Sequence, residues 1–284
     1  MKAVMERPFL DCCGLIAGNG VYPFEWVRNA RTNGVQRIVA VAFEKETDPA
    51  LASQVDEIIW LRVGQLGALL KAFSEREIKQ AIMAGQIAPG NLFDLRPDWK
   101  ALMVLAKLQR RNAETLFGAI ASELASAGVN LLDATTFMEP ALASEGLIAG
   151  PKPKSRQLND FAFGQRIARE MTALDIGQSV VVKNGTVLAV EAFEGTNEAI
   201  QRGGRLGRGN AILAKVSKPN QDFRFDVPVI GLKTLETAKE AGVGFLVLEA
   251  DRTLLLERSK VLEAADRWRI TIYGREPERD SDGS

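Results

Sequence analysis

The sequence has 284 residues, enough for two domains of ordinary size. Hydrophobic residues make up 46% and charged residues 25%, which is typical of a globular protein and excludes a disordered, collagen-like or coiled-coil chain. Lys plus Arg and Asp plus Glu both total 36, so overall attraction to nucleic acid is not expected. There is no histidine, which excludes a Ser-His-Asp triad, a Cys-His dyad and a histidine-ligated metal centre. Any catalysis must therefore rely on carboxylates, Lys, Arg and backbone amides, with or without a hard metal ion.

The two cysteines, Cys12 and Cys13, are adjacent, which leaves no spacing for a disulfide framework or a zinc site. We expect both to be core or strand-edge residues, in a protein of the reducing cytoplasm. Charged residues stand where a signal peptide would need an apolar segment, and no apolar run approaches the about 18 residues of a membrane span. We therefore expect neither a signal peptide nor a spanning helix.

The first half of the chain alternates short apolar runs with amphipathic segments, the pattern of helices that cover a mainly parallel sheet. The pattern predicts strands at 13–17, 37–43, 57–61, 81–85 and 129–133. It predicts helices at 24–32, 66–79, 99–110 and 113–127. This half is thus expected to be Rossmann-like.

A break follows at Gly150, where two prolines, a glycine and two lysines suit neither a strand nor a helix interior. Beyond it we expect a helix at 159–174 and a hairpin of 179–183 with 186–192 around Asn184 and Gly185, a strong two-residue turn signal. Further strands are expected at 211–216, 222–227, 244–248 and 269–273, and helices at 234–241 and 261–268. The fold class is α/β in two domains: a Rossmann-like domain at 1–150, a mixed α/β catalytic domain at 151–275, and a disordered polar tail at 276–284.

Glycines stand between the first predicted strand and helix, in the order Gly14-x-x-x-Gly18-Asn19-Gly20. Backbone amides and a helix N-terminus can face an anion there. The spacing is not the full G-x-G-x-x-G fingerprint, however, and a turn that simply requires positive φ explains the glycines equally well. Both interpretations stay open.

Acidic and basic residues alternate with phenylalanines from Asp222 to Asp226. In an extended chain Asp222, Arg224 and Asp226 would project together, with Phe223 and Phe225 turned into a core. Two carboxylates on one face suit Mg²⁺, which takes one or two carboxylates plus substrate phosphates. The alternative is a surface ion pair bridged by Arg224.

Two further clusters frame this segment. Between residues 201 and 225 there are six basic residues against one acid, and the glycines from Gly203 to Gly209 predict either a phosphate-covering loop or a mobile solvated one. Glu191 and Glu194 stand beside Gly195 and Thr196 and are candidates for a general base, a metal ligand or a sugar-binding group. The alternative is a helix cap box in which Thr196 is the cap. In the first half, Asp94, Arg96 and Asp98 are expected to be turn residues.

Four motifs occur in one order along the chain: Gly14 to Gly20, Asp175 to Val182, Val190 to Thr196, and Lys215 to Gly231. Together they resemble the histidine-free family of UDP-2,3-diacylglucosamine pyrophosphatases of the lipid A pathway. The resemblance covers nearly the whole chain, and the last stretch is long and specific.

This resemblance implies Mg²⁺-dependent hydrolysis of UDP-2,3-diacylglucosamine to 2,3-diacylglucosamine 1-phosphate (lipid X) and UMP, with the substrate site between two domains. It implies a cytoplasmic enzyme with peripheral contact to the inner face of the inner membrane, and a homodimer is compatible with it. In the mechanism we expect, Asp226 and Asp222 hold Mg²⁺ while Lys215, Lys218 and Arg224 neutralise phosphoryl charge; the alternative is that one of the two acids orients the attacking water. The residues expected to bind substrate are Gly18, Asn19, Gly20, Gln178, Glu191, Glu194, Gly195, Thr196 and Gln221.

Other functions stay open on the sequence. A UDP-sugar transferase would release UDP, and a non-catalytic nucleotide-sugar-binding protein would release nothing. A Rossmann-type oxidoreductase is least favoured, because the glycine fingerprint is incomplete and the nearest acids, Glu44 and Glu46, follow the second strand.

Overall fold

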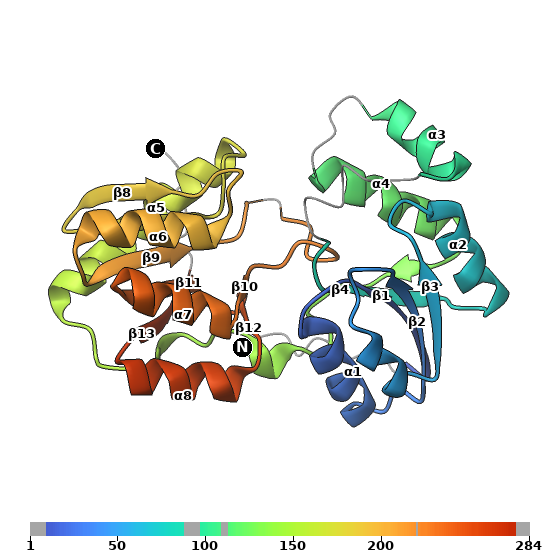
Figure 1. Ribbon diagram of the computed structural model, residues 1–284, viewed down its shortest axis with the longest axis horizontal. Helices are drawn as coiled ribbons and strands as arrows, with labels where there is room; N and C mark the ends of the chain where they lie inside the picture. The colour runs from blue at the N-terminus through green and yellow to red at the C-terminus, as the bar shows by residue number, and fades with distance from the viewer. Residues whose placement is uncertain (1–9, 88–96, 109–112, 220, 277–284) are drawn as a thin grey trace, which may run out of the picture. The chain divides into compact units, whose positions relative to one another are not determined.

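Both halves of the chain are α/β in the computed structural model, which describes residues 10–87, 97–108, 113–219 and 221–276 (Figure 1). The chain divides into two units, and the expected fold class is confirmed. The first unit runs to Met138 and also includes Asp222–Asp226, whereas the second comprises Glu139–Gln221 and the chain from Val227 onward. The break at Gly150 falls inside the second unit, because the strand before it joins that unit's sheet. Residues 277–284 of the predicted tail lie outside the described residues.

The first unit contains a five-stranded parallel sheet in the order β3-β2-β1-β4-β5. Its strands are β1 (Cys12–Ala17), β2 (Arg37–Phe43), β3 (Glu57–Leu61), β4 (Gln80–Ala84) and β5 (Asn130–Leu131). The order reverses between β1 and β4, the point where open α/β sheets bind ligands. Cys13 is fully buried in β1, as expected of a core residue, and burial raises the pKa of its thiol to about 12.

Helices of the first unit follow the apolar spacing of the sequence. They are α1 (Tyr22–Thr32), α2 (Leu66–Glu75), α3 (Trp99–Lys107) and α4 (Ala113–Ser126), with a 3₁₀ turn η1 (Pro49–Ser53). Phe73 of α2 and Leu124 of α4 pack with Val39 of the sheet in one core. Asp98 accepts hydrogen bonds from the amides of Gly67 (2.7 Å) and Ala101 (2.9 Å), so it caps helices. Asp94 and Arg96 lie outside the described residues.

The second unit contains a six-stranded mixed sheet in the order β6-β13-β11-β9-β7-β8. Its strands are β6 (Gly146–Ala149), β7 (Ser179–Lys183), β8 (Thr186–Val190), β9 (Ala211–Lys215), β11 (Val243–Glu249) and β13 (Thr271–Arg275). Strands β9, β11 and β13 are parallel, and the other three pair antiparallel. Asn184 and Gly185 form the predicted hairpin turn, with φ of 52° and 71°. The carboxylate of Asp160 accepts both of their amides.

Two apolar cores sandwich this sheet because its side chains alternate between faces. The helices are α5 (Ser155–Ala173), α6 (Thr196–Gly207), α7 (Leu232–Ala241) and α8 (Arg258–Trp268). Val180 and Val182 share a core with Phe161 of α5, whereas Val181 shares the other core with Ile200 of α6. A separate parallel pair joins β10 (Val229–Ile230) to β12 (Leu254–Leu255).

The glycine-rich segment from Gly203 to Gly209 is neither of the two predicted loops, because most of it belongs to helix α6. A Cβ on Gly203 would lie 2.4 Å from Cβ of Val181, and one on Gly204 would lie 2.2 Å from the carbonyl oxygen of Ala241. These glycines allow α6 to pack closely on β7 and α7, and that packing explains their positions.

None of the helices within the described ranges combines the length and the apolar content that a bilayer crossing requires.

Candidate active site

Polar side chains gather at one edge of the second unit's sheet, where β8, β9 and β11 end. Lys215 is the last residue of β9, Glu249 the last of β11, and Glu191 follows β8. Ser179 begins the antiparallel strand β7 and pairs with Lys215, so it lies at the same edge. The carboxyl ends of parallel strands are the usual location of ligand sites in α/β folds. This edge is therefore the candidate active site of the second unit.

A hydrogen-bonded chain links three of the predicted residues at this edge. The ammonium of Lys215 donates to Oγ1 of Thr196 at 3.0 Å, and that hydroxyl donates to Oε1 of Glu191 at 2.7 Å. Oγ of Ser179 lies 3.4 Å from the same hydroxyl. The second carboxylate oxygen of Glu191 is buried and has no hydrogen-bond partner among the described residues. A buried acceptor of this kind is costly unless a ligand or water satisfies it.

Lys215 lies at the N-terminus of α6, where a cation is electrostatically unfavourable. Gly195 is the N-cap residue, with φ of 88°, and it supplies no side-chain cap; the alternative in which Thr196 caps the helix is therefore wrong. The opposite end of α6 has the favourable arrangement, since Lys183 donates to the carbonyls of Gly207 (2.6 Å) and Gly209 (2.7 Å). A lysine beside uncapped helix amides suits a bound anion such as a phosphate.

Glu194 has a local structural partner. Its carboxylate accepts from Arg202 at 2.8 Å and from the amide of Ala192 at 3.2 Å. Hydrogen bonding from its own backbone amide, together with the nearby Arg202 charge, lowers its pKa despite partial desolvation. Gln178 lies one residue before β7, and its carbonyl accepts the amide of Val216 at 3.0 Å. Substrate contact by Glu194 and Gln178 stays a prediction.

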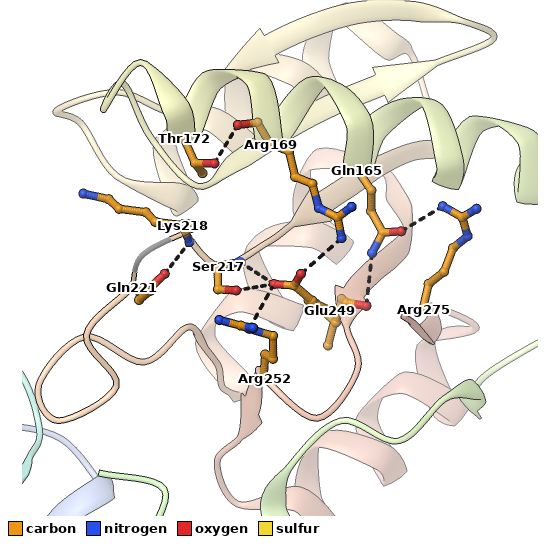
Figure 2. Close-up of polar contacts among 10 residues, drawn as sticks. Gln165, Arg169, Thr172, Ser217, Lys218, Gln221, Glu249, Arg252 and Arg275 are labelled. Atoms are coloured by element: carbon orange, nitrogen blue, oxygen red, sulfur yellow. Dashed lines mark hydrogen bonds and ion pairs between the residues drawn. The ribbon is translucent and has the colours of Figure 1, made fainter. Parts of the chain in front are cut away.

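The chain leaves β9 through a tight, hydrogen-bonded turn (Figure 2). The side chain of Gln221 accepts the amide of Lys218 at 2.5 Å, and the ammonium of Lys218 donates to Asp175 at 2.5 Å. Ser217 donates both its amide (2.7 Å) and its hydroxyl to Glu249. We did not single out Glu249 from the sequence. The only sequence signal for it is that it is the one acid directly after the apolar run from Gly244 to Leu248.

The segment Asp222–Asp226 belongs to the first unit, and it is not extended as predicted. The amides of Phe225 and Asp226 both donate to the carbonyl of Asp222, at 3.2 Å and 3.0 Å, which closes a turn. The ring of Phe225 stacks on that of Phe117 at 5.6 Å and packs against the first unit's core. The expectation that Phe225 faces a core is thus confirmed, although the backbone that carries it is turned rather than extended.

Arg224 forms a two-pronged ion pair with Asp222. Its Nε and Nη2 atoms lie 2.8 Å and 2.6 Å from the two carboxylate oxygens. Hydrogen bonding by Arg224 lowers the pKa of Asp222, and the same pairing raises the pKa of Arg224. The surface ion pair foreseen as an alternative therefore exists between these two residues.

A magnesium ion fits this carboxylate set only in part. Both oxygens of Asp222 are engaged by Arg224, so Asp222 can ligate a metal only after releasing that guanidinium. Within the described ranges no group of three His, Cys, Asp or Glu side chains is arranged to hold a metal. Asp226 alone, completed by substrate phosphates and water, is a donor set that Mg²⁺ commonly accepts.

The glycine turn of the first unit is tied down by its own backbone. The amides of Gly18 and Asn19 donate to the carbonyls of Ala84 (2.8 Å) and Gln86 (2.7 Å). A Cβ on Gly18 would lie 2.5 Å from the Gln86 oxygen, whereas Gly20 has φ of 87° and open space around it. Close approach and positive φ thus explain both glycines, and phosphate binding by Gly18, Asn19 and Gly20 stays a prediction.

An open pocket of about 680 Å³ lies beyond the end of β2, lined by Glu44 to Pro49, Ala52 and Trp60. Asn19 connects it to the glycine turn, since its side-chain amide donates to Glu46 at 2.8 Å. The sequence drew attention to Glu44 and Glu46 but not to Trp60, because an aromatic residue on an edge strand has no distinctive pattern.

Both parts of the chain match known family domains. Residues 12–141 match the LpxI N-terminal domain and residues 144–273 match the LpxI C-terminal domain. A relative described as UDP-2,3-diacylglucosamine pyrophosphatase LpxI, from Caulobacter vibrioides, is 31% identical over 276 residues, which cover 93% of this chain and 98% of the relative. The biotin carboxylase domain of the Hydrogenobacter thermophilus 2-oxoglutarate carboxylase matches with 12% identity over 61% of this chain and 35% of that one, but its TM-score of 0.23 is too low to bear on fold or function. The chain belongs to the LpxI family.

Proposed function

We propose that the protein hydrolyses the pyrophosphate bond of UDP-2,3-diacylglucosamine, a step of lipid A biosynthesis, and releases UMP and 2,3-diacylglucosamine 1-phosphate (lipid X). The observation that carries the proposal is the match to a relative of that name across 93% of this chain, with both family domains present. The absence of histidine is consistent with it, because cations and carboxylates can perform this reaction without an imidazole.

In this proposal the edge of the second unit's sheet binds the pyrophosphate. Lys215 and the uncapped amides that follow Gly195 supply positive charge at one point. The unsatisfied oxygen of Glu191 accepts a hydrogen bond from the substrate or from the attacking water. Lys218 and Arg224 are proposed to neutralise charge on the phosphoryl oxygens. Cleavage of phosphate bonds depends mainly on such positioning and electrostatic stabilisation.

Magnesium is part of the proposal, and Asp226 is the residue that would hold it. The ion, when bound, screens the charge of the pyrophosphate and polarises its phosphorus for attack by water. Asp222 orients Arg224 while the two are paired and becomes a second ligand if Arg224 moves onto a phosphate oxygen.

The chemistry of the proposed substrate determines where the enzyme would act. Two acyl chains keep UDP-2,3-diacylglucosamine at a lipid surface, while its nucleotide lies in water. We place the enzyme in the cytoplasm, with peripheral contact at the inner face of the inner membrane.

The test is to incubate the purified protein with UDP-2,3-diacylglucosamine in detergent, with Mg²⁺ or with excess chelator, and to separate the nucleotide products. UMP formed only with Mg²⁺ is the expected result. Formation of UDP would identify a transferase or glycosidase, and tight binding without any product would identify a binding protein. If UMP forms as fast with excess chelator as with Mg²⁺, the proposed reaction stands but the proposed metal site is wrong.

A further inference from the structure

Glu249 is a buried carboxylate that the proposed mechanism does not use. It ends β11 with 3% of its surface exposed and accepts hydrogen bonds from Ser217 and Arg169 (Figure 2). The amide of Ser217 donates at 2.7 Å and its hydroxyl donates as well, while Nη2 of Arg169 donates at 3.1 Å. Nε of Arg252 lies 3.8 Å from the same carboxylate. One buried acid thus joins α5, the end of β11 and the exit of β9.

This arrangement is not an efficient way to stabilise a fold. A buried ion pair costs desolvation energy that its attraction often only balances, and apolar residues of equal volume commonly do as well. What such a pair does supply is directional bonding, which fixes one backbone conformation. Here the fixed backbone is that of Ser217, two residues beyond Lys215 and next to Lys218.

The chain that follows Glu249 also contacts the segment around Pro228, where the chain returns after Asp222–Asp226. Just beyond Glu249, the amide of Leu254 donates to the carbonyl of Pro228 at 2.8 Å, and β12 pairs with β10. The segment from Glu249 to Leu255 therefore bonds to the second unit's chain at two places, at Ser217 before Asp222–Asp226 and at Pro228 after it. The attachment at Ser217 is the stronger of the two, because the carboxylate of Glu249 makes charge-assisted hydrogen bonds there. The attachment at β10 consists only of the short backbone pairing with β12.

We infer that Glu249 is a positioning residue, which holds the start of the loop after β9, at Ser217, so that Lys215 and Lys218 on either side of it reach the substrate in one geometry. This inference rests on the proposed function for its catalytic consequence. Its structural content, the control of the loop by Glu249, stands independently. Misplacement of reacting groups by about 1 Å can lower a rate on the order of 10²-fold.

The experiment compares Glu249→Gln and Ser217→Ala with the full-length wild-type protein, by steady-state kinetics and by hydrogen–deuterium exchange. Glu249→Gln removes the negative charge and puts an amide nitrogen where one carboxylate oxygen accepted a hydrogen bond. We therefore expect kcat to fall about 10²-fold, with a smaller change in KM. Exchange should rise about tenfold or more at 216–221, with little change in β1 or α1. Ser217→Ala removes one hydroxyl only, and kcat should fall about tenfold. The matched control is Glu170→Gln, which breaks an exposed ion pair with Arg166 on the same helix as Arg169 and should match the wild type.

Unchanged exchange at 216–221 in both variants, with wild-type kcat, would overturn the inference. So would exchange that rises equally throughout the second unit's sheet, because that result describes a purely structural residue. If Glu249→Gln does not fold, Ser217→Ala decides the matter by the same two readouts. Failure of the wild-type protein to release UMP would instead overturn the proposed function, and the exchange comparison would still test the loop.

Discussion

Where β1 and β4 end in the first unit, backbone groups bond to one another, and where β9 and β11 end in the second, charged side chains occupy the edge. The amides of Gly18 and Asn19 donate to the carbonyls of Ala84, at the end of β4, and of Gln86, just beyond it. At the second edge Lys215 and Glu249 are partly or fully removed from water, and Glu191 has a buried oxygen without a partner in the described part of the chain.

The difference separates residues that the fold requires from residues that it only tolerates. A glycine between a strand and a helix is explained by packing or by φ, so it indicates a ligand only weakly. A lysine at a helix N-terminus and an unsatisfied buried carboxylate oxygen both lower stability, so they call for a functional explanation. Natural proteins concentrate such local violations at functional sites.

The largest expected effect comes from Asp226. Asp226→Asn keeps the size of the side chain but removes its charge, and UMP release should fall about 10³-fold or more if this carboxylate holds the metal. Asp222→Asn is the matched comparison and should lose much less, because the proposal assigns the metal to Asp226 and gives Asp222 the pairing with Arg224. Equal losses in the two variants, measured by single-turnover kinetics, would contradict the unequal roles.

The second prediction contrasts the two lysines at the ends of α6. Lys215→Met should lower UMP release about 10²-fold with little change in melting temperature, because the loss of its hydrogen bond to Thr196 offsets the removal of a positive charge from the helix N-terminus. Lys183→Met should do the opposite, with a lower melting temperature and nearly unchanged kcat, because it loses its bonds to Gly207 and Gly209. Thermal denaturation and steady-state kinetics of both variants check this prediction. It would be contradicted if the two variants changed alike in melting temperature and in kcat.

The third prediction concerns the glycine turn. In Gly18→Ala the new methyl group meets the backbone of Gln86, so the free energy of unfolding should fall by about 1–3 kcal/mol. Gly118→Ala is the control: it lies in α4 with open space around it, and it should be neutral or stabilising by up to about 1 kcal/mol. A Gly18→Ala protein of unchanged stability but raised KM would restore the phosphate-loop interpretation.

The smallest expected effect is a pH dependence at Asp222. Arg224 lowers its pKa in the folded protein, so the pair stabilises the fold above the unfolded-state pKa of about 3.9 and loses that contribution as pH falls through the lower folded value. The pair is partly exposed, which limits the contribution to about 1 kcal/mol or less. The difference in melting temperature between wild type and Asp222→Asn should therefore be present at pH 7 and shrink below pH 4. A difference that grows on acidification would contradict this sign.

Much of the fold was predictable from the sequence because apolar periodicity reports burial directly. The strands at 37–43, 57–61 and 179–183 occur where they were expected, as does the turn at Asn184 and Gly185. Helix α6 was missed because three glycines on its buried face looked like a loop, and only the neighbouring β7 and α7 explain why small residues are needed there.

The candidate site was predictable by residue type but not by arrangement. The chain from Lys215 through Thr196 to Glu191 joins residues that the sequence had named separately. The turn at Asp222 was missed because alternating polar and aromatic residues suggest a strand, whereas the segment leaves its own sheet and packs Phe225 in the first unit. Glu249 was missed because its partners are distant in sequence.

The central claim, that the charged edge of the second unit's sheet binds the pyrophosphate, is tested most directly by hydrogen–deuterium exchange. The measurement uses the Asp226→Asn protein with Mg²⁺, with and without UDP-2,3-diacylglucosamine, so that the substrate stays bound without turnover. We expect protection of the amides at the N-terminus of α6 and of residues 215–218. Protection confined to the turn from Gly18 to Gly20, with none at the edge that carries Lys215, would contradict the claim.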